Sequence, residues 1–188
     1  MSLLNSVLKV FVGDKSKQDV KAIMPVVNKI KTFEAATAAL SNDALRAKTN
    51  EFKATILDAC KSLEDTIAAL YVEADTTEDI DRKEDIYQEI DGLKDEVYAK
   101  TQEVLDAILP EAFSVIKETA KRFVNTPQLE VTASPFDREL SGTKDYVTLN
   151  GDKALWANSW DAAGKAITWD MVHYDVQLIG GVAMHQGK

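Results

Sequence analysis

Cysteine, proline and glycine are all scarce in this sequence. Its 188 residues include one cysteine, four prolines and eight glycines. A single cysteine, Cys60, cannot form an intramolecular disulfide or build a zinc site by itself, which suits a reducing compartment. So few prolines and glycines also exclude a low-complexity linker protein. The remaining composition, 45% hydrophobic and 28% charged residues, is typical of a globular protein with a buried core.

Long apolar runs are missing as well. No stretch approaches the roughly 20 apolar residues that a transmembrane helix needs. The first residues, MSLLNSVLKVFVG, contain a short apolar stretch but neither a basic leader nor a small-residue cleavage site. We therefore expect no export signal and no transmembrane helix, and a cytoplasmic protein.

Basic residues are outnumbered, and the two signs are separated along the chain. The formal net charge is −9, which argues against nucleic acid as the main partner because phosphate binding needs a basic surface. Residues 2–31 carry six lysines against two acids, whereas residues 64–106 carry fifteen acids against four bases. The amino-terminal end is therefore basic and the middle of the chain is acidic.

Apolar residues recur at helical spacing through the amino-terminal segment, residues 1–40. Residues 3–11 predict a short amphipathic helix that ends before Gly13. A second helix is expected from a capping signal at Ser16 to about residue 40, with Pro25 as its kink or its start.

Two longer apolar stripes predict an antiparallel helical hairpin over residues 41–109, with its tip near residues 74–77. The first stripe comprises Leu45, Phe52, Ile56, Leu63, Ile67 and Leu70. The second comprises Ile80, Ile86, Ile90, Leu93, Val97, Val104 and Ile108, after a helix start at Thr76 and Thr77. Pro110 occupies a position typical of a first helical turn, so a further helix is expected over residues 110–124.

The pattern changes after residue 124. Short runs rich in β-branched and aromatic residues occur at 129–133, 145–149 and 153–157, with Asn150 and Gly151 between the last two. Asn-Gly between two such runs strongly predicts a β-hairpin, and residues 165–172 offer one more strand. We therefore expect a mainly α fold: a long antiparallel helical hairpin and flanking helices, with a small β-rich insertion at 125–172.

Several segments resemble one known family in their order along the chain. LPEAF at 109–113 and the basic pair KR at 121–122 precede DVQLIGG at 175–181. Together with VVNKI at 26–30 and NDALRAKTNEFK at 42–53, these segments resemble the amino-terminal part of SecA, a bacterial protein-translocation ATPase. The resemblance covers about half of the chain. It implies that residues 173–188 are the glutamine-motif segment of a nucleotide-binding domain.

The terminal Gly187 and Lys188 do not form a phosphate-binding loop. A Walker A loop needs four residues between its glycines and a Ser or Thr after its lysine, whereas Gly181 and Gly187 are separated by five residues and Lys188 is last. The resemblance implies that the true loop lies beyond this point, so we expect this chain alone to be catalytically silent.

The resemblance also implies a cofactor site. ATP, with Mg²⁺ in the parent protein, would be read by Gln177, whose amide accepts from adenine N6 and donates to N7. Tyr174, Asp175, Leu109 and Pro110 would be supporting neighbours. The structural alternative is that Gln177 only caps a turn before two glycines.

The partners that the resemblance implies belong to the parent protein. They are the Sec translocation channel, preproteins and anionic lipids, at the inner face of the cytoplasmic membrane, and a homodimer is compatible with the sequence. Leu4, Leu8, Phe11 and Lys9 suit an interfacial helix on anionic lipid, with packing against the protein's own helices as the alternative.

Two features depart from the family, and one rival function stays open. The acidic hairpin is longer than usual, and residues 125–172 replace what is usually a short connection. The rival is a free-standing helical-hairpin adaptor whose acidic arm binds a basic partner. No metal site is expected, because the two histidines, His173 and His185, are twelve positions apart with no cysteine nearby. The three tryptophans, Trp156, Trp160 and Trp169, are expected to pack in the small sheet, with a ligand cage as the alternative.

Overall fold

The computed structural model describes the backbone of residues 3–187 and the side chains of residues 15 and 17–187. Within this part of the chain the fold is mainly α-helical with two small antiparallel sheets, as predicted. The chain forms two compact units. One unit comprises residues 47–112, and the other comprises residues 1–46 together with 113–188.

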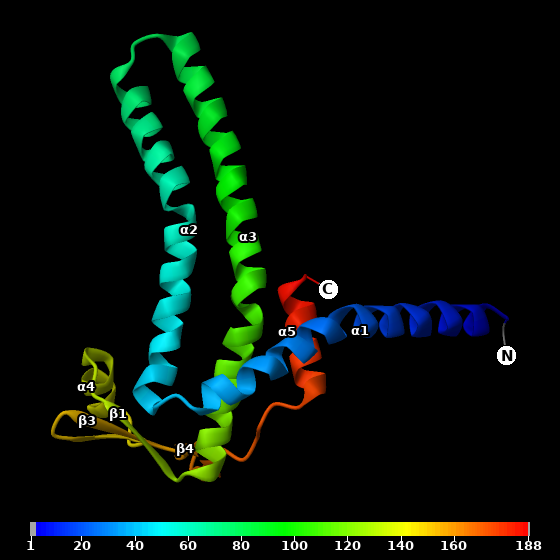
Figure 1. Cartoon of the computed structure of the whole chain (residues 1–188), viewed down its shortest axis with the longest axis vertical. Helices are drawn as coiled ribbons and strands as arrows, with labels where there is room; N and C mark the ends of the chain where they lie inside the picture. Colours follow the sequence, from blue (N-terminus) through cyan, green and yellow to red (C-terminus); the bar gives the residue numbers. More distant parts are fainter. Residues whose placement is uncertain (1–2, 188) are drawn as a thin grey trace. The chain divides into compact units, whose positions relative to one another are not determined.

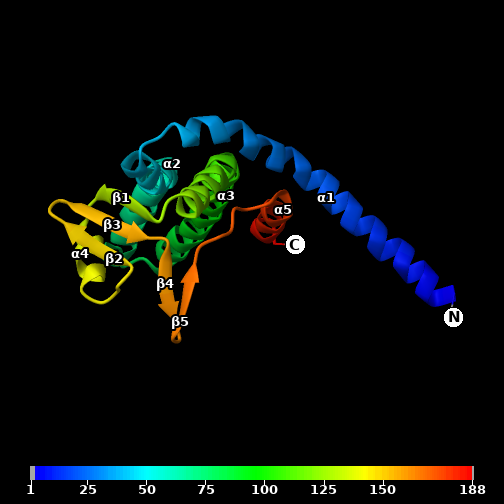
Figure 2. The same ribbon diagram turned by 90° about the horizontal axis from the view of Figure 1, so that it is seen from below.

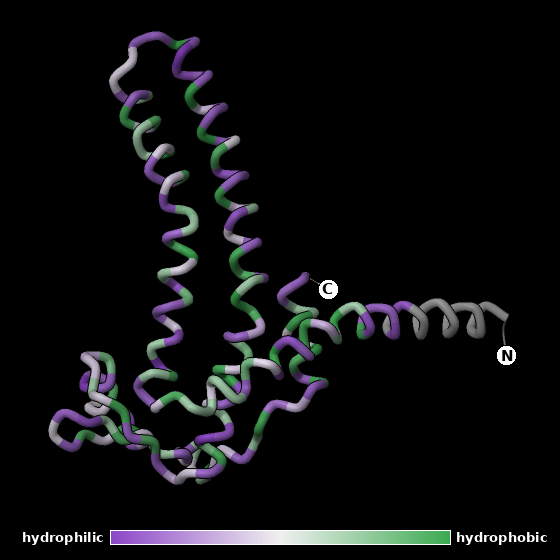
Figure 3. The backbone as a smooth tube through the Cα atoms, viewed as in Figure 1, coloured by the Kyte–Doolittle hydropathy of each residue, from purple (hydrophilic) through white to green (hydrophobic). Residues whose placement is uncertain are grey.

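The first unit is the helical hairpin, with its arms provided by α2 (Asn42–Thr76) and α3 (Ile80–Asn125). The two arms run side by side, with the tip at residues 77–79 (Figure 1). Apolar residues recur along both arms between polar ones (Figure 3). Near the tip they form a buried cluster of Leu70, Ala74, Ile86 and Ile90, with Ile67 and Leu93 packed against it.

Two details of the hairpin differ from the sequence prediction. Ile80, placed in the second stripe, is 79% exposed because it is the first residue of α3 and lies at the tip. The helix start expected at Thr76 and Thr77 is instead made by Asp79, whose carboxylate accepts from the backbone N–H groups of Asp81 and Arg82. An aspartate satisfies these free donors well at a helix amino terminus.

Two helix boundaries predicted at glycine and proline are wrong. Residues 3–11 and 16–40 form one helix, α1 (Leu3–Ala38), which continues through Gly13 and Pro25. Pro110 does not begin a helix but lies inside α3. A proline in a helix interior removes one hydrogen bond and costs about 3 kcal/mol. Pro25 lies between the buried side chains of Ile23 and Val27, and Pro110 is itself fully buried. This burial offsets the cost.

In the second unit, α1 packs against α5 (Asp175–His185) and also contacts the last turns of α3. Ile23, Val27 and Ile30 are fully buried on one face of α1. Further along, the hydroxyl groups of Thr37 and Ser114 form a buried hydrogen bond of 2.9 Å. These contacts join segments that are 77 residues apart in the sequence.

Arg122 closes the carboxyl end of α1. Its guanidinium donates to the carbonyl of Leu40 at 2.7 Å, to the carbonyl of Thr37 at 3.3 Å and to Asn42 Oδ1 at 2.8 Å. The carboxylate of Glu118, one turn earlier, accepts from the Nε of the guanidinium at 2.9 Å. The last carbonyls of a helix have no partner within the helix, so Arg122 acts as a cap supplied by a distant part of the chain.

The expected β-hairpin forms, but its two turn residues are Gly151 and Asp152, because Asn150 ends a strand and pairs with Lys153. Strands β2 (Val147–Asn150) and β3 (Lys153–Ala157) pair antiparallel, and β1 (Gln128–Thr132) pairs with the other edge of β3, giving the order β1-β3-β2. Gly151 has φ of +62°, a conformation that glycine adopts without strain. The buried Val131, Val147 and Ala154 make one face of this sheet.

A second hairpin was only half predicted. The run at 165–172 does supply a strand, β5 (Lys165–Thr168), but its partner is β4 (Ser159–Ala162), and the pair forms a separate two-stranded sheet. The connecting residues Ala163 and Gly164 both have positive φ, as a tight two-residue turn requires. Ala-Gly is a weak signal for such a turn, which is why the sequence did not reveal it.

One short helix, α4 (Pro135–Ser141), was missed. Its first turn holds Asp137, a fully buried carboxylate. The Arg46 guanidinium donates hydrogen bonds to both carboxylate oxygens, at 2.7 and 2.8 Å. The Ser134 hydroxyl and the Trp156 indole N–H donate to the same carboxylate. Burial alone would raise the pKa of Asp137, but the Arg46 and Ser134 contacts outweigh it and hold that pKa far below its usual range.

Candidate functional site

The segment DVQLIGG forms the start of a helix, α5 (Asp175–His185), preceded by Tyr174 in an extended conformation. Gln177 lies in the first turn, and its Oε1 accepts from the backbone N–H of Tyr174 at 2.8 Å. Its Nε2 lies 3.1 Å from the sulfur of Met171. The amide of Gln177 therefore closes the helix start, as glutamine does in a capping box, while the residue itself is exposed.

α5 lies beside α1 (Figure 2). Leu178 and Val182 form its buried face. At its amino end, Asp175 accepts a hydrogen bond from Lys31 of α1 at 2.6 Å. Both side chains of this ion pair are about half exposed, so the pair contributes at most about 1 kcal/mol. It nevertheless ties the glutamine-motif segment to the amino-terminal helix.

Gly181 is the point where two of the sequence segments meet. A Cβ atom added at Gly181 would lie 2.8 Å from the ring of Phe113, the last residue of LPEAF. Carbon atoms pack best at about 3.5 to 4.0 Å, so only glycine allows the ring to approach α5 this closely. Gly180 has open space around the same position. Sequence reasoning did not single out Phe113, although a glycine pair inside a helix is itself a sign of close packing.

The structure brings together only some of the predicted site residues. Tyr174, Asp175 and Gln177 lie together at the start of α5, with Tyr174 73% exposed. Leu109 and Pro110 belong to the hairpin unit, and Pro110 is fully buried there. The predicted lipid-binding side chains, those of Leu4, Leu8, Lys9 and Phe11, lie outside the described residues.

An open hollow of about 600 Å³ adjoins the start of α5. It is lined by Lys117 of α3, by Asp170 and by the stretch from Val172 to Val176. Gln177 is not part of this lining. His173 contributes a ring nitrogen, Nδ1, that is buried without a hydrogen-bond partner. The hollow thus offers one ammonium group, two carboxylates and an imidazole beside the expected adenine-reading segment.

Among the described residues, no helix is long and apolar enough to cross a bilayer, and no three potential ligand side chains are placed to hold a metal ion. The features that distinguish this site are therefore the capped start of α5, the ion pair with α1 and the close contact with Phe113.

Known proteins match nearly the whole of this chain, and the matches agree on one family. Residues 8–188 match the family described as SecA DEAD-like domain. The protein translocase subunit SecA of Christiangramia forsetii is 68% identical over all 188 residues, and that of Flavobacterium psychrophilum is 57% identical. The chain spans 17% of the length of each of these two relatives. The SecA subunit of Phocaeicola vulgatus is 48% identical over 94% of this chain, which is 16% of that protein. No solved structure matches the chain.

Proposed function

Because this chain belongs to the SecA DEAD-like domain family, we propose that it is the amino-terminal portion of an ATP-driven motor that moves preproteins across the bacterial cytoplasmic membrane through the Sec channel. The two relatives that match all 188 residues are named protein translocase subunits. The observation that carries the proposal is the continuous match from residue 8 to residue 188, which includes the hairpin and the β-rich region.

Within that motor, the start of α5 is proposed to read the adenine of ATP through Gln177. In this chain the Oε1 of Gln177 uses one lone pair for Tyr174 N–H, and an amide oxygen has a second lone pair. That lone pair can accept from adenine N6 while the amide nitrogen, now beside the Met171 sulfur, turns to donate to N7. The cap and the base contact are therefore compatible.

The test uses two substitutions in a full-length parent, where the phosphate-binding part of the site is present. Gln177→Glu preserves the cap, since glutamate serves equally at this position, but faces adenine N7 with a carboxylate. Gln177→Ala removes both the cap and the base contact. A good bidentate base contact discriminates by roughly 1 to 3 kcal/mol, so both variants should bind ATP about ten to a hundred times more weakly.

The ratio of ATP affinity to GTP affinity separates the two roles of Gln177. If Gln177 reads adenine, the ratio falls in both variants, and more in Gln177→Glu because of the added repulsion. If Gln177 only caps α5, Gln177→Glu leaves the ratio and the stability unchanged. A matched control is Gln186→Glu at the other end of the same helix, which should leave the ratio as it is.

The 188-residue chain alone is proposed to be catalytically silent, because no Walker A pattern occurs in its sequence. Isothermal titration should show no micromolar ATP affinity, and phosphate release should equal that of buffer. Micromolar binding by this chain would mean that its nucleotide site has been assigned to the wrong place.

Contact with anionic lipid is proposed for residues 3–11, whose apolar residues recur at helical spacing and are flanked by lysines. The chain should sediment with vesicles that contain anionic lipid, and less so as salt is raised. Neutral vesicles are the control. Equal sedimentation after deletion of residues 2–12 would refute this role and favour packing of the segment on protein.

A further inference from the structure

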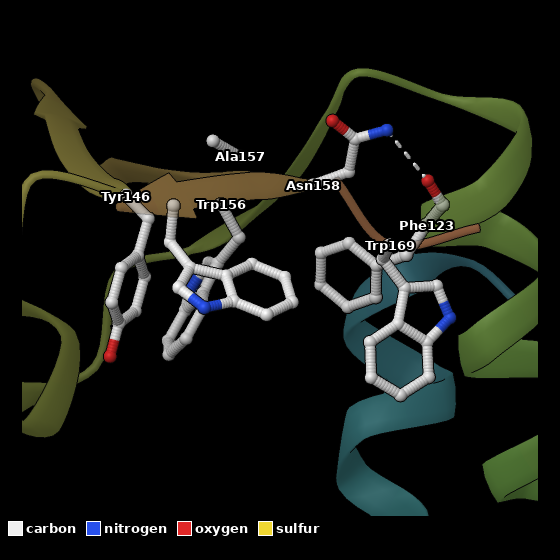
Figure 4. A pocket seen from close by; sticks show the side chains of 7 residues that line it. Phe123, Tyr146, Trp156, Ala157, Asn158 and Trp169 are labelled. Atoms are coloured by element: carbon white, nitrogen blue, oxygen red, sulfur yellow. Dashed lines mark hydrogen bonds between the residues drawn. The ribbon is translucent and has the colours of Figure 1, made fainter. Parts of the chain in front are cut away.

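All three tryptophans of the chain line one pocket of about 250 Å³ in the β-rich region. The proposed nucleotide site at the start of α5 does not include this pocket. Figure 4 shows the labelled rings of Tyr146, Trp156, Phe123 and Trp169 projecting to one side of the strands. The residues that line the pocket include Phe123, Tyr146, Trp156, Asn158, Trp160 and Trp169.

The pocket presents ring faces and few polar atoms. The indole N–H of Trp156 is bonded to Asp137, and that of Trp169 to the carbonyl of Met171 at 2.7 Å. These donors are therefore occupied by the protein itself. Tyr146 and Trp156 lie with ring centroids 6.3 Å apart and planes tilted by 41°, so their faces do not cover each other.

The pocket is also held in shape without a ligand. The amide of Asn158 donates to the carbonyl of Phe123 at 2.9 Å, which fastens the end of β3 to the last turn of α3. The indole of Trp156 is fixed at its far side by the buried Asp137. A binding site that is already formed loses little entropy when a ligand enters.

The surroundings favour a cation. No charged side chain lines the pocket. Three of its aromatic residues each have an aspartate as a neighbour in the sequence. These pairs are Asp145 and Tyr146, Trp160 and Asp161, and Trp169 and Asp170. Residues 125–172 carry seven acids and four bases. Aromatic faces attract ammonium and guanidinium groups, most strongly for tryptophan, and the negative surroundings add to that attraction.

We propose that this pocket binds a lysine or arginine side chain of a partner polypeptide. The β4–β5 sheet, which carries Trp160, has two strands only among the described residues, so each strand keeps one edge without a strand partner. Such edges bind extended polypeptide by backbone hydrogen bonds. A polypeptide can therefore use the edge for its backbone and the aromatic pocket for its cationic side chain. This inference is independent of the proposed nucleotide site.

The first test compares a cation with its neutral isostere on the 188-residue protein. Tryptophan fluorescence reports the pocket directly, because no tryptophan lies elsewhere. Choline and 3,3-dimethylbutan-1-ol have nearly the same shape but differ in charge. Choline should change the emission saturably and bind about tenfold more tightly, as expected for a partly desolvated cation over aromatic rings. Equal affinities, or no saturable change with choline, would overturn the proposal.

The second test identifies the source of the cation. Nα-acetyl-lysine amide should bind more tightly than Nα-acetyl-norleucine amide, which has an aliphatic side chain and no charge. Binding of choline without binding of the lysine amide would overturn the assignment to a polypeptide. Trp160→Leu should weaken both cations about tenfold, whereas Tyr98→Leu, on the exposed surface of the hairpin, should leave them unchanged. Because both probe pairs act on the unaltered protein, the result does not depend on the folding of a variant.

Discussion

Gly180 and Gly181 offer a sharp test of how α5 packs, because they are adjacent in the same helix and have different surroundings. Alanine at Gly180 meets nothing within 4 Å, whereas alanine at Gly181 places its Cβ 2.8 Å from the Phe113 ring. Both substitutions make the same chemical change at interior positions of α5. Any difference between them therefore measures the contact with Phe113.

The magnitudes follow from helix propensity and overpacking. Glycine in a helix interior costs roughly 0.5 to 1 kcal/mol relative to alanine, so Gly180→Ala should stabilise the fold by about that amount. Gly181→Ala gains the same term but loses about 1 to 3 kcal/mol to overpacking. The contact is with the far end of the Phe113 ring, where a small shift of the side chain relieves the overlap, and this favours the lower part of that range. We expect the two variants to differ by about 1 to 2 kcal/mol.

Urea unfolding followed by tryptophan emission is the suitable assay, since α5 and the three tryptophans belong to the same unit. Phe113→Leu in the Gly181→Ala background should recover part of the loss, because a smaller side chain vacates the space. If both alanine variants stabilise the protein equally, Phe113 does not pack on Gly181. The contact between LPEAF and DVQLIGG would then be wrong.

Two further predictions concern buried groups. Asp137→Asn should cost about 1.5 to 3 kcal/mol at neutral pH, because it replaces the charge-assisted hydrogen bonds from Arg46 by weaker neutral ones, while the remaining Arg46 side chain is 37% exposed to water. Asp145→Asn, an exposed control, should change little. Folding lowers the pKa of Asp137, so the ionised carboxylate stabilises the folded protein fully above its unfolded pKa near 4, and this stabilisation is lost as the pH falls below that value. Urea midpoints measured at several pH values should therefore fall in acid for the control. The same acid dependence should be absent from Asp137→Asn. Ile90→Asp should destabilise the hairpin by several kcal/mol, as measured by circular dichroism, because it buries an unpaired charge. The exposed Ile80→Asp should stay within about 0.5 kcal/mol, and equal effects of the two would contradict the buried cluster.

The hairpin was predictable because its apolar residues repeat over many helical turns. Ile86 and Ile90 are buried where the stripe placed them, and the tip falls within three residues of the expected turn. Helix boundaries at Gly13, Pro25 and Pro110 were not predictable, because local propensity is weak compared with tertiary packing. The hairpin was identified because Gly151 meets the backbone requirement of its turn, although the turn residues are Gly151 and Asp152 and Asn150 ends the strand before them.

The missed features depend on contacts between distant residues. The pattern Ser134-Pro135-Phe136-Asp137 is a helix start that the sequence does display, but nothing local indicates that its aspartate is buried against Arg46. The candidate site shows the same division. The segment DVQLIGG directed attention to Gln177 through family resemblance alone, whereas the Phe113 contact with Gly181 appears only in three dimensions.

The cap that Arg122 places on α1 has a consequence for synthesis of the chain. The carbonyl of Leu40 and the guanidinium that binds it are 82 residues apart. At roughly 5 to 20 residues per second, a ribosome needs about 4 to 16 s to extend the chain from one to the other. During that interval the guanidinium of Arg122 is not yet available to the carbonyls at the carboxyl end of α1, and the arms of the hairpin are made in the meantime. The amino-terminal helix therefore acquires its final boundary after the hairpin has emerged, and its docking is ordered by the direction of translation.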